Sequence, residues 1–214
     1  MIRLTIRETA LLTSAFAICG LMLAGVVGEA RAFAQEKKEA PAAQSGAAGG
    51  AQPATEAKSA TDLPAANPKD VESLDAIVAA VYDVISGPPG PRDWNRFNSL
   101  FANDARLIAV RTPKDGGKPS LVIMSPKDYQ ERAGKHFLER GFFEHEIGRK
   151  TDSFGAMTHI YTTYESRETK DGKPIDRGIN SMEFFHDGTR WWCVQIYWDA
   201  ERPGNPIPEK YLGK

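Results

Sequence analysis

Three side chains in this 214-residue chain have the chemistry to act on a small molecule. His159 lies in the middle of a predicted strand, and an imidazole with an ordinary pKa of about 6.5 suits proton transfer. Asn180 can donate hydrogen bonds from its amide, and Tyr82 from its hydroxyl. Each has a plain structural alternative. The histidine can simply pack among aromatics, the asparagine can satisfy nearby backbone groups, and the tyrosine can belong to a helical core.

Large aromatic side chains are concentrated near the end of the chain. Residues 177–203 hold three of the four tryptophans around an Asp187-Gly188 turn. These rings could form core, line a pocket or support a partner. Strand alternation places Trp192, Val194, Ile196 and Trp198 on one face and Trp191, Cys193, Gln195 and Tyr197 on the other. We expect the first face to line a pocket and the second to require a cover.

Metal and nucleic-acid chemistry find no support in the sequence. The other histidines, His136, His145 and His186, fall on a helix, another strand and a turn, so no pair has metal-ligand spacing. We therefore expect no metal and no other cofactor. The formal net charge is −1, and no basic stripe accompanies the aromatic rings. We expect no nucleic-acid partner.

The first 34 residues read as a secretory signal peptide. Arg3 and Arg7 precede an apolar run at 11–28, and "AFA" before Gln35 is a small-x-small cleavage site. We expect cleavage after Ala34 and a periplasmic or secreted protein. The alternative is an uncleaved anchor, in which case this segment alone would contact a membrane.

The two cysteines do not form an internal disulfide if the signal peptide is removed. Cys19 lies inside the apolar run, and Cys193 is then alone. An isolated cysteine on a predicted strand is usually a small buried apolar residue.

The rest of the chain divides into a linker and one folded domain. Residues 35–67 are rich in Ala, Gly, Gln and Pro and bury too little apolar surface to order themselves. Residues 68–214 are long enough for one good core. The domain boundaries are therefore 1–34, 35–67 and 68–214.

The pattern of the domain predicts three helices and six strands. Helices are expected after the caps Asn67, Asp93 and Ser125, and Gly87 follows the end of the first of them. Strands are expected at "ARLIAVRT", "SLVIMS", 142–151, 154–167, 175–186 and 190–199. The order ααββαββββ predicts an α+β domain in which a bent antiparallel sheet wraps over helices and leaves a hollow. The tail after Ala200 is expected to be a surface strap.

This order resembles the NTF2-like superfamily, whose domains have a cystatin-like cone shape. The resemblance rests on "LFANDARL" (100–107) after the second helix and on the final hairpin "RGINSMEFFHDGTRWW". It covers nearly all of 68–214 and implies an exported, bacterial-type member. The superfamily includes ketosteroid isomerase, SnoaL-type cyclases and scytalone dehydratase, so fold alone does not specify activity. Many of its members dimerise through the sheet, and we expect a homodimer of that kind.

The last hairpin is similar to that of ketosteroid isomerase. "NSMEFFHDG" then puts Asn180 at the oxyanion-donor position, and "QIYWDAE" makes Trp198 the pocket tryptophan. Tyr82 matches the tyrosine that supplies the second oxyanion hydrogen bond. "GAMTHIY" resembles the preceding pocket strand. The residues expected in the pocket are Tyr82, Trp94, Met157, His159, Tyr161, Asn180, Trp192 and Trp198, with Met157, His159 and Tyr161 pointing inward.

One departure from the family removes its usual base. The catalytic aspartate of ketosteroid isomerase corresponds to Ala109, in a run without carboxylates. Three functions are left. The domain could bind a small, partly apolar ligand, or be a SnoaL- or dehydratase-type lyase or isomerase with His159 as base and Asn180 and Tyr82 polarising a carbonyl. It could also be a structural dimerisation module with a filled hollow.

Overall fold

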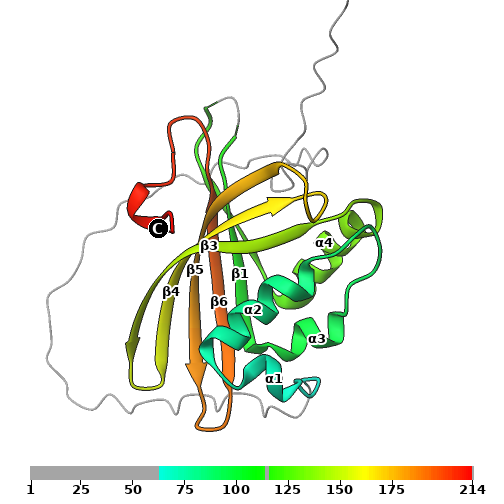
Figure 1. Ribbon diagram of the computed structural model, residues 1–214, viewed down its shortest axis with the longest axis vertical. Helices are drawn as coiled ribbons and strands as arrows, with labels where there is room; N and C mark the ends of the chain where they lie inside the picture. Colours follow the sequence, from blue (N-terminus) through cyan, green and yellow to red (C-terminus); the bar gives the residue numbers. More distant parts are fainter. Residues whose placement is uncertain (1–62, 114–115, 214) are drawn as a thin grey trace, which may run out of the picture. The chain divides into compact units, whose positions relative to one another are not determined.

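The computed structural model describes residues 63–113 and 116–213, in which helices cover one face of a six-stranded sheet (Figure 1). The helices are α1 (Pro68–Val71), α2 (Leu74–Ile85), α3 (Trp94–Ser99), α4 (Pro126–Glu139) and the 3-10 turn η3 (Glu209–Tyr211). The strands are β1 (Phe101–Arg111), β2 (Ser120–Met124), β3 (Phe143–Phe154), β4 (Met157–Arg167), β5 (Pro174–His186) and β6 (Trp191–Ala200). The predicted signal peptide, and the linker as far as residue 62, lie outside the described residues.

The predicted helix starts are confirmed, with one helix divided in two. Asn67 caps α1, but Ser73 adopts an extended conformation and its hydroxyl accepts a hydrogen bond from the Ala76 N–H at 3.1 Å. A second helix therefore begins at this cap. At α4, Ser125 and Asp128 form a reciprocal capping box. No helix in the described part of the chain is long and apolar enough to cross a bilayer.

The sheet has the strand order β2-β1-β6-β5-β4-β3. The α+β class is confirmed, and the strand sequence follows the predicted order. All neighbouring strands are antiparallel except β1 and β6, which are parallel, so the expectation of a wholly antiparallel sheet was wrong for that pair. The β3–β4 turn is at Gly155 and Ala156, which makes β3 longer than the predicted 142–151.

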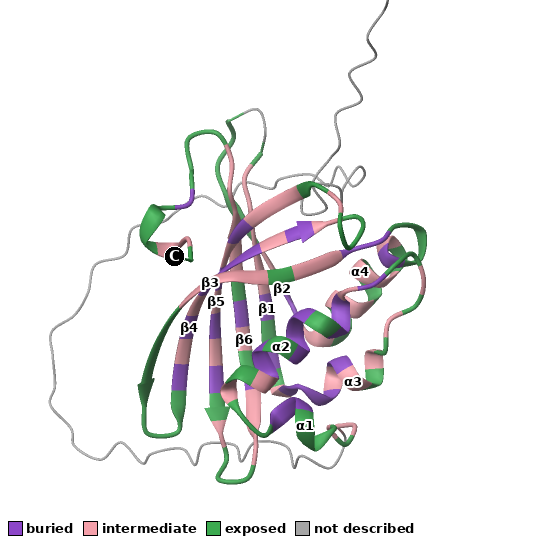
Figure 2. Cartoon of the chain, in the orientation of Figure 1, coloured by how far each residue is buried: buried purple, intermediate pink, exposed green. Residues whose placement is uncertain are grey.

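The core lies on the face of the sheet that carries α1–α4, called the helix face below. Ile160 on β4, Met182 and Phe184 on β5 and Ile77 on α2 are each at most 1% exposed. Figure 2 shows buried segments on the strands and on α2. Alternate residues of each strand consequently point to the opposite, outer face.

A β-bulge at Val194 changes which tryptophans face the core. Glu183 pairs with Gln195, but Phe184 pairs with Cys193, so one residue of β6 has no partner. As a result Cys193 is fully buried, and Trp191 packs against the core. Trp192 is on the outer face. The predicted faces of Trp191, Trp192 and Cys193 were therefore wrong, because strict alternation does not continue through a bulge.

The tail after Ala200 crosses the sheet edge as a strap. The Thr163 hydroxyl donates to the Tyr211 carbonyl at 2.6 Å, and the Gly213 N–H donates to the Ile147 carbonyl at 3.2 Å. A Cβ at Gly148 would collide with this strap. The expected surface strap is confirmed and is fixed to β3 and β4.

Candidate functional site

A buried chain of hydrogen bonds joins α2 to the helix face of the sheet. The Asn180 amide donates to Tyr82 Oη at 3.1 Å, and Tyr82 Oη shares a second hydrogen bond with Thr162 Oγ1 at 3.1 Å. Tyr82 and Asn180 are each 5% exposed, and Thr162 is fully buried. Burial, reinforced by the charge of Glu144, raises the pKa of Tyr82. The tyrosine is therefore a neutral hydroxyl under ordinary conditions.

Strand register explains why these residues meet. Thr162 on β4 is the direct partner of Asn180 on β5, which is the partner of Trp198 on β6. Trp198 is in turn paired with Ala109 on β1. The half-buried Trp198 ring meets the edge of Tyr129 with centroids 6.5 Å apart. The structure thus brings together Tyr82, Asn180 and Trp198 as predicted, and puts Ala109 in the same row without a carboxylate.

Two carboxyl groups occupy a second row on the helix face. Glu144 on β3 pairs with Ser166 on β4, and Ser166 pairs with Asp176 on β5. Burial raises the pKa of Glu144 to about 8, and the charge of Asp176 adds to the effect. Burial also raises the pKa of Asp176 to about 6, although hydrogen bonds from the Arg177 N–H and from Tyr164 oppose it. Within the described residues no hydrogen bond reaches the Glu144 carboxyl.

Tyr164 lies in the row between these two sets. It is 3% exposed and is the direct partner of Gly178, whose missing side chain leaves room for the phenol. A Cβ at Gly178 would collide with Tyr164 Oη and with the Asp199 carbonyl. The glycine therefore lets Tyr164 reach the Asp176 carboxylate. Two tyrosines, an amide and two carboxyls with raised pKa values thus share the helix face, an arrangement typical of functional sites.

The three residues predicted to point inward from β4 lie on the outer face instead. Their neighbours Thr158, Ile160 and Thr162 are the buried ones. His159 Nε2 is hydrogen-bonded to Ser181 Oγ at 3.0 Å, the Tyr161 ring packs on Tyr211, and Met157 is 58% exposed. The predicted phase of this strand was wrong by one residue. His159 therefore cannot serve as a base beside Asn180 and Tyr82 in this fold.

The two other predicted pocket tryptophans are also elsewhere. Trp94 meets the Phe97 ring edge-on at 5.4 Å and stacks on Phe137 at 6.3 Å, which places it between α3 and α4. Trp192 donates from its indole to Asp187 Oδ2 at 2.7 Å on the outer face. Neither Trp94 nor Trp192 lies in the row of paired strand residues that contains Asn180.

Sequence reasoning missed four polar residues of the helix face, which are Thr162, Tyr164, Glu144 and Asp176. The signal was the run Thr158-x-Ile160-x-Thr162-x-Tyr164-x-Ser166, in which every second residue is buried. Polar residues at these positions are compatible with a polar interior and equally with a solvent-exposed face. Alternation alone therefore does not identify the buried face of the strand.

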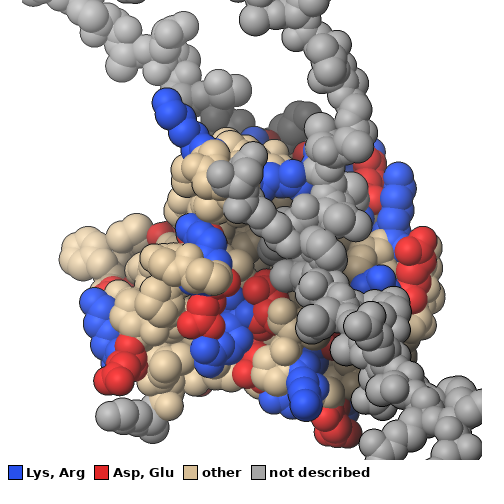
Figure 3. Space-filling view, turned by 90° about the horizontal axis from the view of Figure 1, so that it is seen from above, with Lys and Arg blue, Asp and Glu red and all other residues tan. Residues whose placement is uncertain are grey.

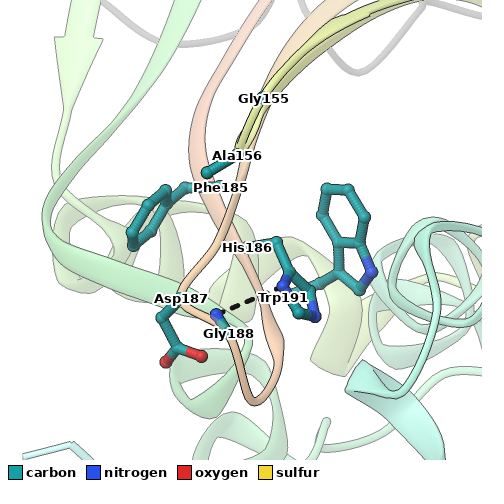
Figure 4. Close-up of a pocket in the computed structure, with 7 residues that line it drawn as sticks. All are labelled: Gly155, Ala156, Phe185, His186, Asp187, Gly188 and Trp191. Carbon is teal, nitrogen blue, oxygen red and sulfur yellow. Dashed lines mark hydrogen bonds between the residues drawn. The ribbon is translucent and has the colours of Figure 1, made fainter.

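A shallow groove lies at the other end of the sheet, between the β3–β4 and β5–β6 turns (Figure 4). It is lined by Gly155, Ala156, Phe185, His186, Asp187, Gly188 and Trp191. The His186 and Trp191 rings meet edge-on at 5.0 Å, and His186 Nδ1 accepts the Gly188 N–H at 3.2 Å. This open groove shares no residue with the hydrogen-bonded chain of Tyr82.

Charged side chains form no metal site in the part of the chain that the structure describes. The face seen in Figure 3 shows Lys and Arg interleaved with Asp and Glu. Among the ion pairs of the described residues, Arg96 bridges Asp70 at 2.7 Å and Asp83 at 2.5 Å.

Comparison with known proteins finds similarity in solved structures only. No protein-family model matches the chain, and no curated protein sequence matches it. LinA aligns with a TM-score of 0.45 at 8% identity, covering 61% of this chain and 85% of its own. A protein of unknown function with a cystatin-like fold from Nostoc punctiforme gives 0.44 at 12%, covering 60% and 88%. Yeast UBP3-associated protein BRE5 gives 0.43 at 12%, covering 59% and 92%. At these identities the matches say nothing of activity, and the fold assignment rests on element and strand order.

Proposed function

We propose that this NTF2-like domain binds a small, partly apolar molecule on the helix face of its sheet and holds a carbonyl or carboxylate oxygen of that molecule with Asn180 and Tyr82. The observation that carries the proposal is the buried hydrogen bond between these two side chains, in the same row as Trp198. A buried amide and hydroxyl provide neutral donors of the kind that fix a ligand oxygen in an apolar site.

Asn180 has hydrogen-bonding capacity to spare. Its side chain makes one hydrogen bond in the described part of the chain, to Tyr82. An amide offers two N–H donors and an acceptor oxygen, so one donor and the oxygen are left for a ligand. Because Asn180 is only 5% exposed, a ligand would pair these groups at a place that little water reaches.

The apolar part of the ligand would rest on the Trp198 side of the row. Trp198 is half-buried, and Tyr129 from α4 meets it edge-on. Ala109 is the next residue of the row and has a small side chain. A flat hydrophobic body with one oxygen acceptor suits this combination of rings and donors.

The proposal can be tested with prodan, a flat aryl ketone whose emission reports the polarity and hydrogen bonding of its carbonyl. We expect saturable binding with a shifted emission, and at least about tenfold weaker binding by Asn180→Ala. Ser181→Ala is the matched control, because Ser181 is the adjacent residue and its hydroxyl bonds His159 on the outer face. Equal affinity of the two variants, or an absence of binding by the parent protein, would refute the site and favour a structural module with a filled hollow.

A second candidate function is proton transfer at the same site, with Glu144 in the role first assigned to His159. It is favoured by the position of Glu144 in one row with Asp176 on the helix face, next to the row of Tyr164. A carboxyl with a pKa of about 8 can act as acid or base near neutral pH. We expect Glu144→Gln to abolish any lyase or isomerase turnover while leaving prodan binding intact. Loss of both together would instead indicate a structural role.

We also propose that the protein is exported and forms a dimer, and one further experiment tests both properties. We propose cleavage after Ala34 and a periplasmic or secreted location. Of the residues expected on the outer face, Trp191 and Cys193 face the core instead, while Trp192 joins Tyr197 on the outer face, so aromatic rings remain available there for a sheet dimer. Native mass spectrometry of the exported protein measures the first residue and the oligomeric state in one experiment.

A further inference from the structure

The β3–β4 hairpin has an apolar tip that the fold does not use. Phe154 and Met157 flank the two-residue turn Gly155-Ala156 and are 83% and 58% exposed. Gly155 has a φ of 58°, as expected at the first central position of a tight hairpin turn. Hairpin turns are normally polar at their surface. Two large apolar side chains at such a position are available for a contact outside the domain.

These two residues begin a continuous row across four strands. Phe154 pairs with Met157, Met157 with Phe185 on β5, and Phe185 with Trp192 on β6. Direct partners share a face, so all four lie on the outer face, at the end where both hairpins turn. Figure 2 shows exposed segments at both hairpin ends. We call Phe154, Met157, Phe185 and Trp192 the apolar tip row.

The apolar tip row is small for a stable protein interface. Phe154, Met157 and Phe185 together expose roughly 350–400 Å², taking about 200 Å² for each free side chain. A specific protein interface needs about 800 Å² from each partner. Beyond the row the outer face is mixed: His159, Ser181 and Glu183 are polar, while Val194 and Tyr197 are each 39% exposed. A second copy of the chain would have to cover these polar groups as well.

A lipid surface does not have to cover these polar groups, and a cationic side chain lies beside the apolar tip row. Arg190 stacks over the Trp192 ring at 3.7 Å and donates to the carbonyls of Ser99 and Trp191. Within the described residues it forms no direct ion pair. Asp187 accepts the indole N–H of Trp192, and Asp152 and Glu183 pair with His159 in the next row of the outer face. Tryptophan and arginine side by side are typical of the boundary between apolar lipid and headgroups.

We propose that the apolar tip row inserts into the surface of a phospholipid bilayer, with Phe154 and Met157 deepest and Arg190 at the level of anionic headgroups. A protruding hairpin tip can enter a soft lipid layer without a complementary pocket. The contact is separate from the helix face, so it leaves ligand binding unaffected.

The test uses the full chain and vesicles of phosphatidylethanolamine with phosphatidylglycerol. Phe154→Trp places a reporter at the tip, and Leu138→Trp places one at an equally apolar position on α4, where Leu138 is 58% exposed. Each spectrum is compared with that of the parent chain. We expect a blue shift, and quenching by brominated lipid, for the tip reporter alone. This local readout does not depend on whether the N-terminal apolar run also binds lipid.

A second measurement tests how much the apolar tip row contributes to vesicle binding. The double variant Phe154→Ser/Met157→Ser should weaken vesicle binding, followed by quenching of the chain's tryptophan emission by brominated lipid, at least about tenfold, and Leu138→Ser should not. An unshifted tip reporter, or equal quenching in both reporters, would overturn the proposal. So would a dimer in the parent chain that the double variant dissociates without lipid present, because the row would then be covered by a second copy.

Discussion

Asn180 and Tyr82 are hydrogen-bonded at 3.1 Å although 98 residues separate them in the chain. The contact ties α2 to the centre of the sheet, and Tyr82 extends it to Thr162 on β4. Because both ends are buried, the same atoms stabilise the fold and form the polar part of the proposed site. Stability and ligand binding must therefore be measured separately for any variant here.

Removing the Tyr82 hydroxyl should destabilise the domain. In Tyr82→Phe, Asn180 and Thr162 each lose a buried partner, and we expect the free energy of unfolding to fall by about 2 kcal/mol. Tyr197→Phe is the control, because Tyr197 is 39% exposed on the outer face and should change stability by less than about 0.5 kcal/mol. Urea unfolding followed by circular dichroism measures both. Equal midpoints for the two variants would mean that the buried chain contributes no stability.

The fold was predictable because its signals are local. Caps at Asn67, Asp93 and Ser125 mark the helices, and the Asp187-Gly188 turn marks the last hairpin. These features depend on residues within a few positions of one another, which the sequence displays directly.

The site was only partly predictable because strand phase is not a local property. On β5, Met182 and Phe184 are unambiguously apolar, so the face of Asn180 was assigned correctly. On β4, polar residues occupy both faces, and the wrong set was placed inside. On β6, the bulge at Val194 shifts the phase by one residue, and nothing in the composition of that strand marks it.

Glu144 should make the stability of the domain depend on pH in an unusual direction. Its pKa is about 8 in the folded protein and about 4.5 in the unfolded chain. Between these values the folded state retains a proton that the unfolded state has released, so stability falls as pH rises from about 4.5 to about 8. The loss is complete above the folded pKa.

Glu144→Gln removes this dependence because the amide cannot ionise. We expect the variant to match the parent protein near pH 4.5 and to be more stable at about pH 9, by on the order of 2–4 kcal/mol. Thermal unfolding at both pH values measures the difference. Glu131→Gln, on the exposed surface of α4, should change stability little at either pH. A variant less stable than the parent at high pH would mean that the folded protein stabilises the ionised Glu144 carboxylate.

Gly148 should control the attachment of the C-terminal strap. A Cβ there would collide with the Tyr211 carbonyl and the Gly213 N–H, and the strap can move away more easily than the strand. In Gly148→Ala we expect trypsin to cut after Lys210 about tenfold faster, since the site opens by local detachment. Mass spectrometry of timed digests measures the rate. Thr151→Ala, at an exposed position of the same strand, is the control, and similar rates for both would show that the strap does not depend on Gly148.

The Cys193 thiol should be unreactive in the folded protein, and its reactivity therefore tests whether the bulge in β6 exists. It is fully buried, and burial raises the pKa of its thiol far above the ordinary value. In a Cys19→Ser background, we expect a disulfide reagent to modify Cys193 roughly a thousandfold more slowly than in the urea-unfolded chain.

The matched position is the next residue, Val194, which is 39% exposed because of the bulge. With Cys193 replaced by Ser, Val194→Cys should react rapidly in the folded protein. An unbulged β6 gives the opposite pattern, with a reactive Cys193 and a protected residue 194. It would also move Trp192 to the helix face and Trp191 to the outer face. Two reaction rates therefore determine which tryptophans line the core, and with them whether the apolar tip row extends to β6.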